Sequence, residues 1–261
     1  MKLRELTGFL ESIADLSLQE SYDNSGLIFG NPEMEITSVL CSLDCTKKVL
    51  IEAKERNCNV VVSHHPIVFS GIKKFNERNY VDQAIIYAIK NDIAIYAIHT
   101  NLDNVFQHGV NQKIAQRLDL QNLQILSPKP GLEKTGAGII GNLKQGLASS
   151  DFLSFVKKQL HTLLVRHTRL LKDPIQKVAI AGGSGAFLIK EAIRSNADVF
   201  ITADIKYHDF FDANDEILLM DVGHYESEQF TIELLYELIS QNFSKFATHY
   251  TKISTNPVHY F

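Results

Sequence analysis

The spacing of apolar residues along the chain predicts helices that alternate with strands. Leu3, Leu6 and Leu10 recur at helical spacing, so residues 2–14 are expected to form an amphipathic helix. Further helical patterns lie at 47–56, 80–90, 110–118, 151–160, 187–194 and 225–241. Continuous apolar runs indicate buried strands at 39–43, 60–62, 93–98, 137–143, 177–181, 198–201 and 217–220. This alternation predicts an α/β fold with mainly parallel sheets covered by helices.

A turn-rich segment at 119–135 divides the pattern into two halves. It contains Pro128, Pro130 and Gly131, which favour turns, so it is the expected boundary. We therefore predict an N-terminal α/β half over 1–126 and a C-terminal α/β half over 127–261. The stretch 49–63 also aligns without gaps on 188–202, each a helix–strand unit that ends in a small hydroxyl residue. This internal sequence similarity predicts that the two halves are structurally related.

The composition is that of an ordinary globular protein and argues against several other classes. The chain has 261 residues, of which 45% are hydrophobic and 21% are charged, as in ordinary globular proteins. The 26 basic and 30 acidic residues give a net charge of −4, which offers no overall support for nucleic-acid binding. No apolar run is long enough to span a membrane, and the first residues lack the pattern of a signal peptide. Cys41, Cys45 and Cys58 form no CxxC motif, so a reducing cytoplasm is the expected location.

Side chains that can ligate metals follow four of the predicted strands. They lie at 64–65, 99–103, 204–208 and 224. Open α/β sheets bind ligands beyond the carboxyl ends of their strands, where these residues are expected. His224 and Glu228 are four apart at the start of a helix, so they share one face. An imidazole beside a carboxylate suits zinc, iron or manganese.

The adjacent pair His64-His65 favours two metal ions over one. Neighbouring side chains in a strand point to opposite faces, so both imidazoles can serve only where the strand ends and Pro66 fixes the turn. Divergent imidazoles suit two ions, which Asp103 could bridge. Ordinary alternatives remain for each residue. Asp103 could form an Asx turn, Glu228 could be a solvated helix charge, and an isolated histidine such as His99 is more often a hydrogen-bonded residue than a ligand.

Two further features have a functional and an ordinary interpretation. The run Gly182-Gly183-Ser184-Gly185 could cradle a phosphate with its backbone N–H groups, or it could form a tight strand-to-helix turn. It lacks both the GxGxxG spacing and the lysine of a P-loop. Lys73, Lys74 and Arg78 follow the histidine pair and could attract an anionic substrate, or they could belong to a solvated loop.

Seven segments together resemble the NIF3 family, also called GTP cyclohydrolase I type 2. They run in family order over nearly the whole chain, at 22–27, 42–46, 63–66, 99–103, 181–185, 201–209 and 223–228. Tyr22 stands where the family usually has tryptophan, and the segment from Thr202 to His208 is looser than the family pattern. The short linker between the halves indicates that the middle domain of longer members is absent.

The resemblance implies a centre of two divalent ions, of zinc, iron, manganese or nickel. The family's ligand positions fall on His64, His65, Asp103, His224 and Glu228, with Asp103 and Glu228 as the carboxylates that contact both ions. The resemblance also implies interlinked halves and a toroidal homohexamer.

The family name implies hydrolysis of a nucleotide-like substrate, with opening of the guanine imidazole ring and loss of formate. His208 is the candidate proton carrier, because imidazole titrates near neutral pH. The alternatives are a metal-dependent phosphoesterase, or a non-catalytic metal-binding ring that acts as a scaffold, a regulator or a nucleic-acid binder.

Overall fold

Residues 1–261 are described by a computed structural model, in which the chain forms two compact units. The first unit consists of Met1–Leu102 and Thr231–Pro257, and the second of Asp103–Phe230 and Val258–Phe261. The predicted halves are continuous segments, whereas here the segment 231–257 rejoins the first unit. The reason is that Ala247–Tyr250 (β11) pairs with Ser38–Ser42 (β2) and completes the sheet of that unit.

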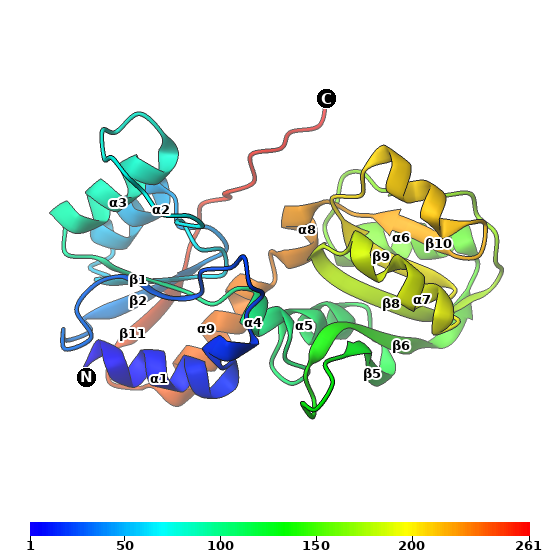
Figure 1. Cartoon of the computed structure of the whole chain (residues 1–261), viewed down its shortest axis with the longest axis horizontal. Helices are drawn as coiled ribbons and strands as arrows, with labels where there is room; N and C mark the ends of the chain where they lie inside the picture. The colour runs from blue at the N-terminus through cyan, green and yellow to red at the C-terminus, as the bar shows by residue number, and fades with distance from the viewer. The chain divides into compact units, whose positions relative to one another are not determined.

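The first unit is built on a five-stranded sheet. Its order is β1-β4-β3-β2-β11, where β1 is Gly26–Phe29, β3 is Val60–Ser63 and β4 is Ala94–Ala97. The strands β4, β3, β2 and β11 are parallel, and β1 pairs with β4 in the antiparallel sense. Helices Lys47–Glu55 (α2) and Tyr80–Lys90 (α3) cover one face of the sheet, and Leu3–Ile13 (α1) and Thr231–Asn242 (α9) cover the other (Figure 1). The unit also contains the short helix Leu16–Leu18 (η1) and the first three residues of Thr100–Asp103 (α4), whose last residue begins the second unit.

The local sequence explains where these elements begin and how they pack. Leu3, Leu6 and Leu10 form the apolar stripe of α1 and are fully buried. The side chain of Thr46 caps α2 by accepting a hydrogen bond from the Val49 N–H. All four residues of β3 are buried, because helices cover both faces of the sheet.

The second unit is built on a six-stranded mixed sheet. Its order is β5-β6-β8-β9-β10-β7, with β8, β9 and β10 parallel and the outer pairings antiparallel. The strands are Gln121–Pro128 (β5), Gly136–Leu147 (β6), Arg166–His167 (β7), Ile175–Ser184 (β8), Val199–Ala203 (β9) and Leu218–Asp221 (β10). The helices are Val110–Arg117 (α5), Ser149–Gln159 (α6), Ala186–Leu188 (η2), Ile189–Arg194 (α7), Tyr207–Ala213 (η3) and His224–Glu228 (α8). The predicted α/β class is confirmed.

The structure adds strands to the predicted pattern and divides one of its helices. The turn-rich segment 119–135 contains a strand that the apolar pattern did not predict, β5 at the edge of the second sheet. Pro128 is tolerated as the last residue of that strand, because an edge strand does not need every backbone N–H. The predicted helix over 225–241 is two helices, α8 and α9, which belong to different units. The internal echo is matched by α2–β3 and α7–β9, which both place a helix before a central parallel strand.

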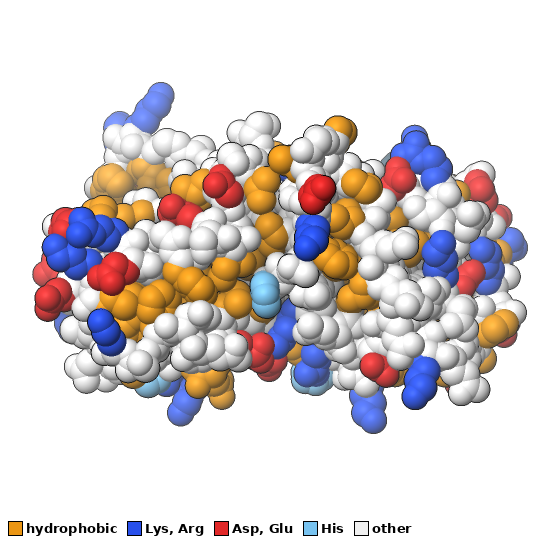
Figure 2. Space-filling model, turned by 90° about the horizontal axis from the view of Figure 1, so that it is seen from below, with side chains coloured by type: hydrophobic (Ala, Val, Ile, Leu, Met, Phe, Trp, Pro, Cys, Tyr) orange, Lys and Arg blue, Asp and Glu red, His pale blue; other side chains and the backbone are white.

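The surface shows a mixture of charges. On the face drawn in Figure 2, basic and acidic side chains are interspersed among apolar ones, which agrees with the near balance of charge in the composition. None of the helices combines the length and the apolar character needed to cross a bilayer.

Glu52 on α2 anchors the chain that follows β11. Its carboxylate accepts hydrogen bonds from the Thr251 hydroxyl and from the Lys252 N–H, the latter at 3.0 Å. Arg56 pairs with the same carboxylate at 2.9 Å and donates to the Tyr250 carbonyl at 3.0 Å. Burial alone would raise the pKa of Glu52, but these hydrogen bonds hold that pKa below its usual range.

Replacement of Glu52 by glutamine is expected to destabilise the protein in a pH-dependent way. At pH 7, Glu52→Gln should lower the free energy of unfolding by about 1–3 kcal/mol, because the charged acceptor of three donors is lost. A carboxyl group whose pKa is depressed by folding stabilises the native state above its unfolded pKa and loses that effect as acid protonates it. Urea unfolding should therefore show the gap between wild type and variant closing below a pH of about 4.3.

Glu55→Gln provides the matched control, because Glu55 lies on the same helix and is exposed. It should change the unfolding free energy by less than about 0.5 kcal/mol. A gap for Glu52→Gln that persists unchanged into acid would contradict the assigned role of the charge.

Candidate metal centre

Three histidines of the first unit gather beyond the carboxyl ends of β3 and β4. His64 and His65 follow β3, and His99 lies two residues beyond β4. Their ring centroids are 5.0–5.3 Å apart, and the ligand atoms that they offer all lie within 4.8 Å of one another. His64 is fully buried, and the side chains of His65 and His99 are 16% and 13% exposed. The parallel pairing of β3 with β4 brings these side chains together.

Each of these imidazoles is held through its Nδ1 atom by an oxygen acceptor. The bonds join His64 to the Ile98 carbonyl at 2.9 Å, His65 to Asp44 at 2.8 Å and His99 to Asp23 at 2.7 Å. Carbonyl and carboxylate oxygens only accept, so Nδ1 carries the proton and Nε2 becomes the nitrogen that can ligate. Histidines that bind metals in proteins almost always have this arrangement.

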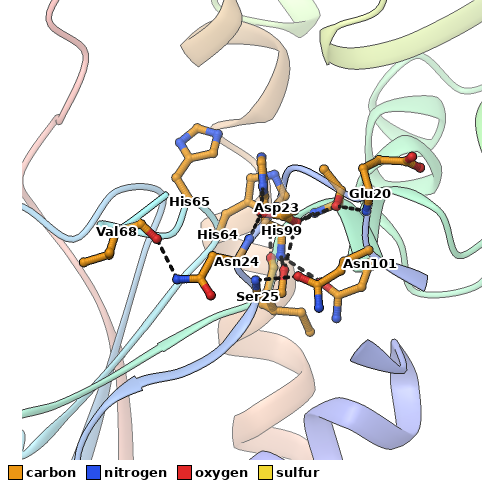
Figure 3. Close-up of polar contacts among 12 residues, drawn as sticks. Glu20, Asp23, Asn24, Ser25, His64, His65, Val68, His99 and Asn101 are labelled. Carbon is orange, nitrogen blue, oxygen red and sulfur yellow. Dashed lines mark hydrogen bonds and ion pairs between the residues drawn. The ribbon is translucent and has the colours of Figure 1, made fainter. Parts of the chain in front are cut away.

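Asp23 organises the His99 side of this cluster, as Figure 3 shows. Its side chain is fully buried and accepts hydrogen bonds from the Ser25 hydroxyl, the Thr100 hydroxyl and the Thr100 N–H. Burial alone would raise the pKa of Asp23, but hydrogen bonds from His99 and Thr100 hold that pKa well below its usual range. The ionised form of the Asp23 carboxylate is therefore favoured beside the His99 ring.

The second unit places His224 between two carboxylates. His224 begins α8, its Nδ1 lies 2.7 Å from Asp204 and its Nε2 lies 3.0 Å from Glu228. Asp204 follows β9 and α8 follows β10, so adjacent parallel strands supply this group. Burial would lower the pKa of His224, but the hydrogen bonds to Asp204 and Glu228 raise it to about 11. The two carboxylates thus favour positive charge between them.

The glycine run of the sequence makes room for Glu228. Gly182 and Gly183 lie just before the last residue of strand β8, Ser184, and a Cβ atom on Gly183 would lie 2.3 Å from Glu228 Oε1. Gly183 has a φ of +62° and donates its N–H to the Ser227 hydroxyl at 2.9 Å. Only glycine combines this backbone conformation with so close an approach. The first three residues of the run belong to strand β8, and Gly185 leads directly into η2, so the connection from strand to helix is tight and the strand end packs against a carboxylate.

The two remaining predicted site residues, Asp103 and His208, differ in their burial and in their contacts. Asp103 is the last residue of α4, is half-buried, and accepts a hydrogen bond from Asn111 on its backbone carbonyl at 3.1 Å. His208 lies in η3, is exposed, and makes ring contacts with Tyr207 and Phe211. The role of His208 as a proton carrier stays a prediction.

The structure brings predicted site residues together within each unit. His64 lies beside His65 in the first unit, and His224 contacts Glu228 in the second. The sequence analysis placed His99 and Asp204 at strand ends rich in possible ligands but gave neither a role in the site. It missed Asp23 and Asp44 as the carboxylates that hold His99 and His65. The signal for Asp23 was its place in the polar segment 21–25, which precedes the short strand β1. Oriented imidazole nitrogens beside carboxylates form a donor set that fits zinc, iron, manganese or nickel.

Known proteins are similar to this chain in sequence and in fold. Residues 1–257 match the family profile described as Duf34/NIF3, NGG1p interacting factor 3. A Clostridium perfringens protein named GTP cyclohydrolase 1 type 2 homolog is 34% identical over 229 residues, which cover 87% of each chain. A Staphylococcus epidermidis protein of the same name is 29% identical over an alignment of 368 positions that covers all of both chains. That relative therefore carries residues that this chain lacks.

Solved structures agree with the sequence relatives. A crystal structure of a Staphylococcus aureus hypothetical protein superimposes with a TM-score of 0.94 at 30% identity, and covers 100% of this chain and 99% of that one. A Bacillus cereus protein related to NIF3 shares the fold with a TM-score of 0.90 at 24% identity, and covers 100% and 99% of the two chains. Because the family profile matches nearly the whole sequence, the chain belongs to the DUF34/NIF3 family.

Proposed function

We propose that the chain is a hydrolase that uses two divalent metal ions and acts on a nucleotide-like substrate. His64 and His65 are the proposed ligands from the first unit. Asp103, His224 and Glu228 are the proposed ligands from the second. The observation that carries this proposal is common to both units, because each of the proposed histidine ligands has its Nδ1 atom held by an oxygen acceptor.

The residues of the chain would orient and charge-balance such a centre. Divalent ions, when bound, polarise substrate oxygens and lower the pKa of water. Asp44 and Asp204 fix the planes of two imidazoles and keep Nε2 as the ligand nitrogen. Gly183 lets Glu228 approach the backbone closely.

The substrate class rests on the relatives and on local charge. The curated relatives are named homologs of GTP cyclohydrolase 1 type 2, and from them we infer hydrolytic opening of a guanine imidazole ring with release of formate. Lys73, Lys74 and Arg78 are exposed soon after the histidine pair, where their charge would attract a triphosphate. His208 is proposed as a proton carrier, and the toroidal homohexamer is proposed as the assembly.

Formate release from GTP is the direct test of the reaction. Protein reconstituted with zinc or manganese should release formate from GTP, and His64→Ala should abolish that release. A parallel screen of phosphate esters distinguishes a phosphoesterase, which would release phosphate without formate. Turnover of neither substrate by fully loaded protein, together with a salt-dependent complex with single-stranded DNA, would support the non-catalytic alternative.

Metal content tests the ligand assignment independently of activity. We expect gently purified protein to contain up to two ions per chain by elemental analysis. His64→Ala and His224→Ala should each weaken metal binding by at least about 10- to 100-fold, the loss seen even for residues that only support a ligand. His259→Ala is the control, because that histidine is exposed near the C-terminus. Wild-type protein that neither contains nor binds a divalent ion at neutral pH would contradict the proposal.

Gly183→Ala is expected to damage the centre without removing any ligand. Its Cβ would collide with the Glu228 carboxylate, so that side chain must move away. Metal affinity should fall by about 10-fold or more. Gly8→Ala is the control, because a Cβ there meets nothing within 4 Å in the middle of α1, and it should leave metal binding unchanged. Equal metal affinity of the two variants would show that Glu228 does not need this approach.

A further inference from the structure

A chain of hydrogen bonds connects the C-terminal segment to a proposed metal ligand. The Thr255 hydroxyl donates to Oδ2 of Asp44, and Oδ1 of the same carboxylate accepts from His65 Nδ1 at 2.8 Å. Thr255 and Asp44 are 211 positions apart in the sequence, yet both belong to the first unit. The function proposed above uses Asp44 only as the partner of His65 and gives no role to Thr255.

The order of strands in the first sheet explains this connection. The strands β11, β2 and β3 are parallel neighbours, with Tyr250 opposite Cys41 and Ser42 opposite Ser63. Their carboxyl ends therefore lie side by side. The chain beyond β11 leads to Thr255, the chain beyond β2 leads to Asp44, and the chain beyond β3 leads to His65. The order of the hydrogen bonds repeats the order of the strands.

The segment 251–255 is anchored before it reaches Asp44. The Thr251 N–H donates to the Cys41 carbonyl at 2.9 Å, and Glu52 holds the next residue, Lys252. Ile253 packs against the apolar core between the sheet and helices α2 and α3. These contacts hold the backbone from Thr251 to Ile253, two residues before Thr255, whose side chain donates to the Asp44 carboxylate.

Asp44 benefits from a second hydrogen bond because its side chain is 33% exposed. A carboxylate held at one oxygen can still rotate about its side-chain torsions toward water. With Thr255 on Oδ2 and His65 on Oδ1, both oxygens are engaged by the protein. The plane of the carboxylate, and with it the plane of the His65 ring, is then set by two contacts. Such outer contacts commonly tune metal affinity.

We propose that Thr255 is a positioning residue for the metal ligand His65, acting through Asp44, so that the C-terminal segment 251–255 sets the affinity of the ion that His65 binds. This inference rests on the proposed metal-binding function. The segment 251–255 would thus influence a metal ligand from which it is far removed in the sequence. The effect is specific to the hydroxyl group of Thr255 and to the ion on His65.

The test compares zinc binding by full-length variants that differ only in this hydroxyl. Each protein is stripped with a chelator and titrated with Zn²⁺ against a chromogenic competitor that resolves two affinities. Thr255→Val keeps the shape but removes the hydroxyl, and we expect about a 3- to 10-fold loss for one ion, the scale of one hydrogen bond. Asp44→Asn should cost about 10- to 100-fold for the same ion. Thr255→Ser, which restores a hydroxyl, should lie within about twofold of wild type.

Two further measurements separate positioning from a general loss of structure. Ser254→Ala changes the exposed neighbour in the same segment and should bind both ions as the wild type does. The Co²⁺-loaded Thr255→Val protein should show a shifted visible absorption band, because the ligand field of one ion changes. Its urea midpoint should stay close to that of the Ser254→Ala protein.

The outcomes distinguish this inference from the function on which it depends. Thr255→Val that binds both ions as tightly as Ser254→Ala, in a protein whose wild type binds zinc well, would overturn the positioning role alone. Thr255→Ser that loses as much affinity as Thr255→Val would also overturn it, because the hydroxyl would then be irrelevant. A wild type that binds neither zinc nor manganese, iron or nickel would overturn the proposed function and this inference together.

Discussion

The hydrogen bond to Nδ1 of each histidine is the interaction on which the candidate metal centre depends. An imidazole has two nitrogens, and only one of them can face an ion. An oxygen acceptor beside the ring fixes the tautomer and holds the plane of the ring. His64 uses a backbone carbonyl for this purpose, whereas His65, His99 and His224 use carboxylates. The rings are thus organised by the protein before any ligand arrives.

Parallel strand pairing brings these acceptors to the rings. In the first sheet, β4, β3, β2 and β11 end beside one another, and the residues that follow them contribute His99, the His64-His65 pair, Asp44 and Thr255. In the second sheet, Gly183 lies near the end of β8, and the residues that follow β9 and β10 contribute Asp204 and His224. Each unit thereby uses the edge where α/β sheets bind ligands. The helix–strand echo between the two units, seen in α2–β3 and α7–β9, agrees with this shared design.

Burial of charge in these units is compensated locally. Asp23 and Glu52 are both carboxylates with little exposure, and in each case several hydrogen-bond donors hold the pKa below its usual range. Asp23 uses this charge to hold His99, whereas Glu52 uses it to anchor the chain after β11. A buried carboxylate that is held ionised by hydrogen bonds therefore supports the candidate site at Asp23 and the fold at Glu52.

The sequence by itself determined the α/β class and most element positions, and its resemblance to a family predicted the five proposed ligands. Apolar periodicity placed α1, α3 and β3 within one or two residues, because burial on one face or on both leaves a local pattern. It also paired His224 with Glu228, since helical spacing is local. Only the tertiary structure decided what pairs across long separations: β11 beside β2, the break between α8 and α9, His99 beside His64, and Thr255 on Asp44. Those contacts depend on the order of strands in a sheet. That order is set by pairing between distant segments, so it cannot be inferred from any short stretch of sequence.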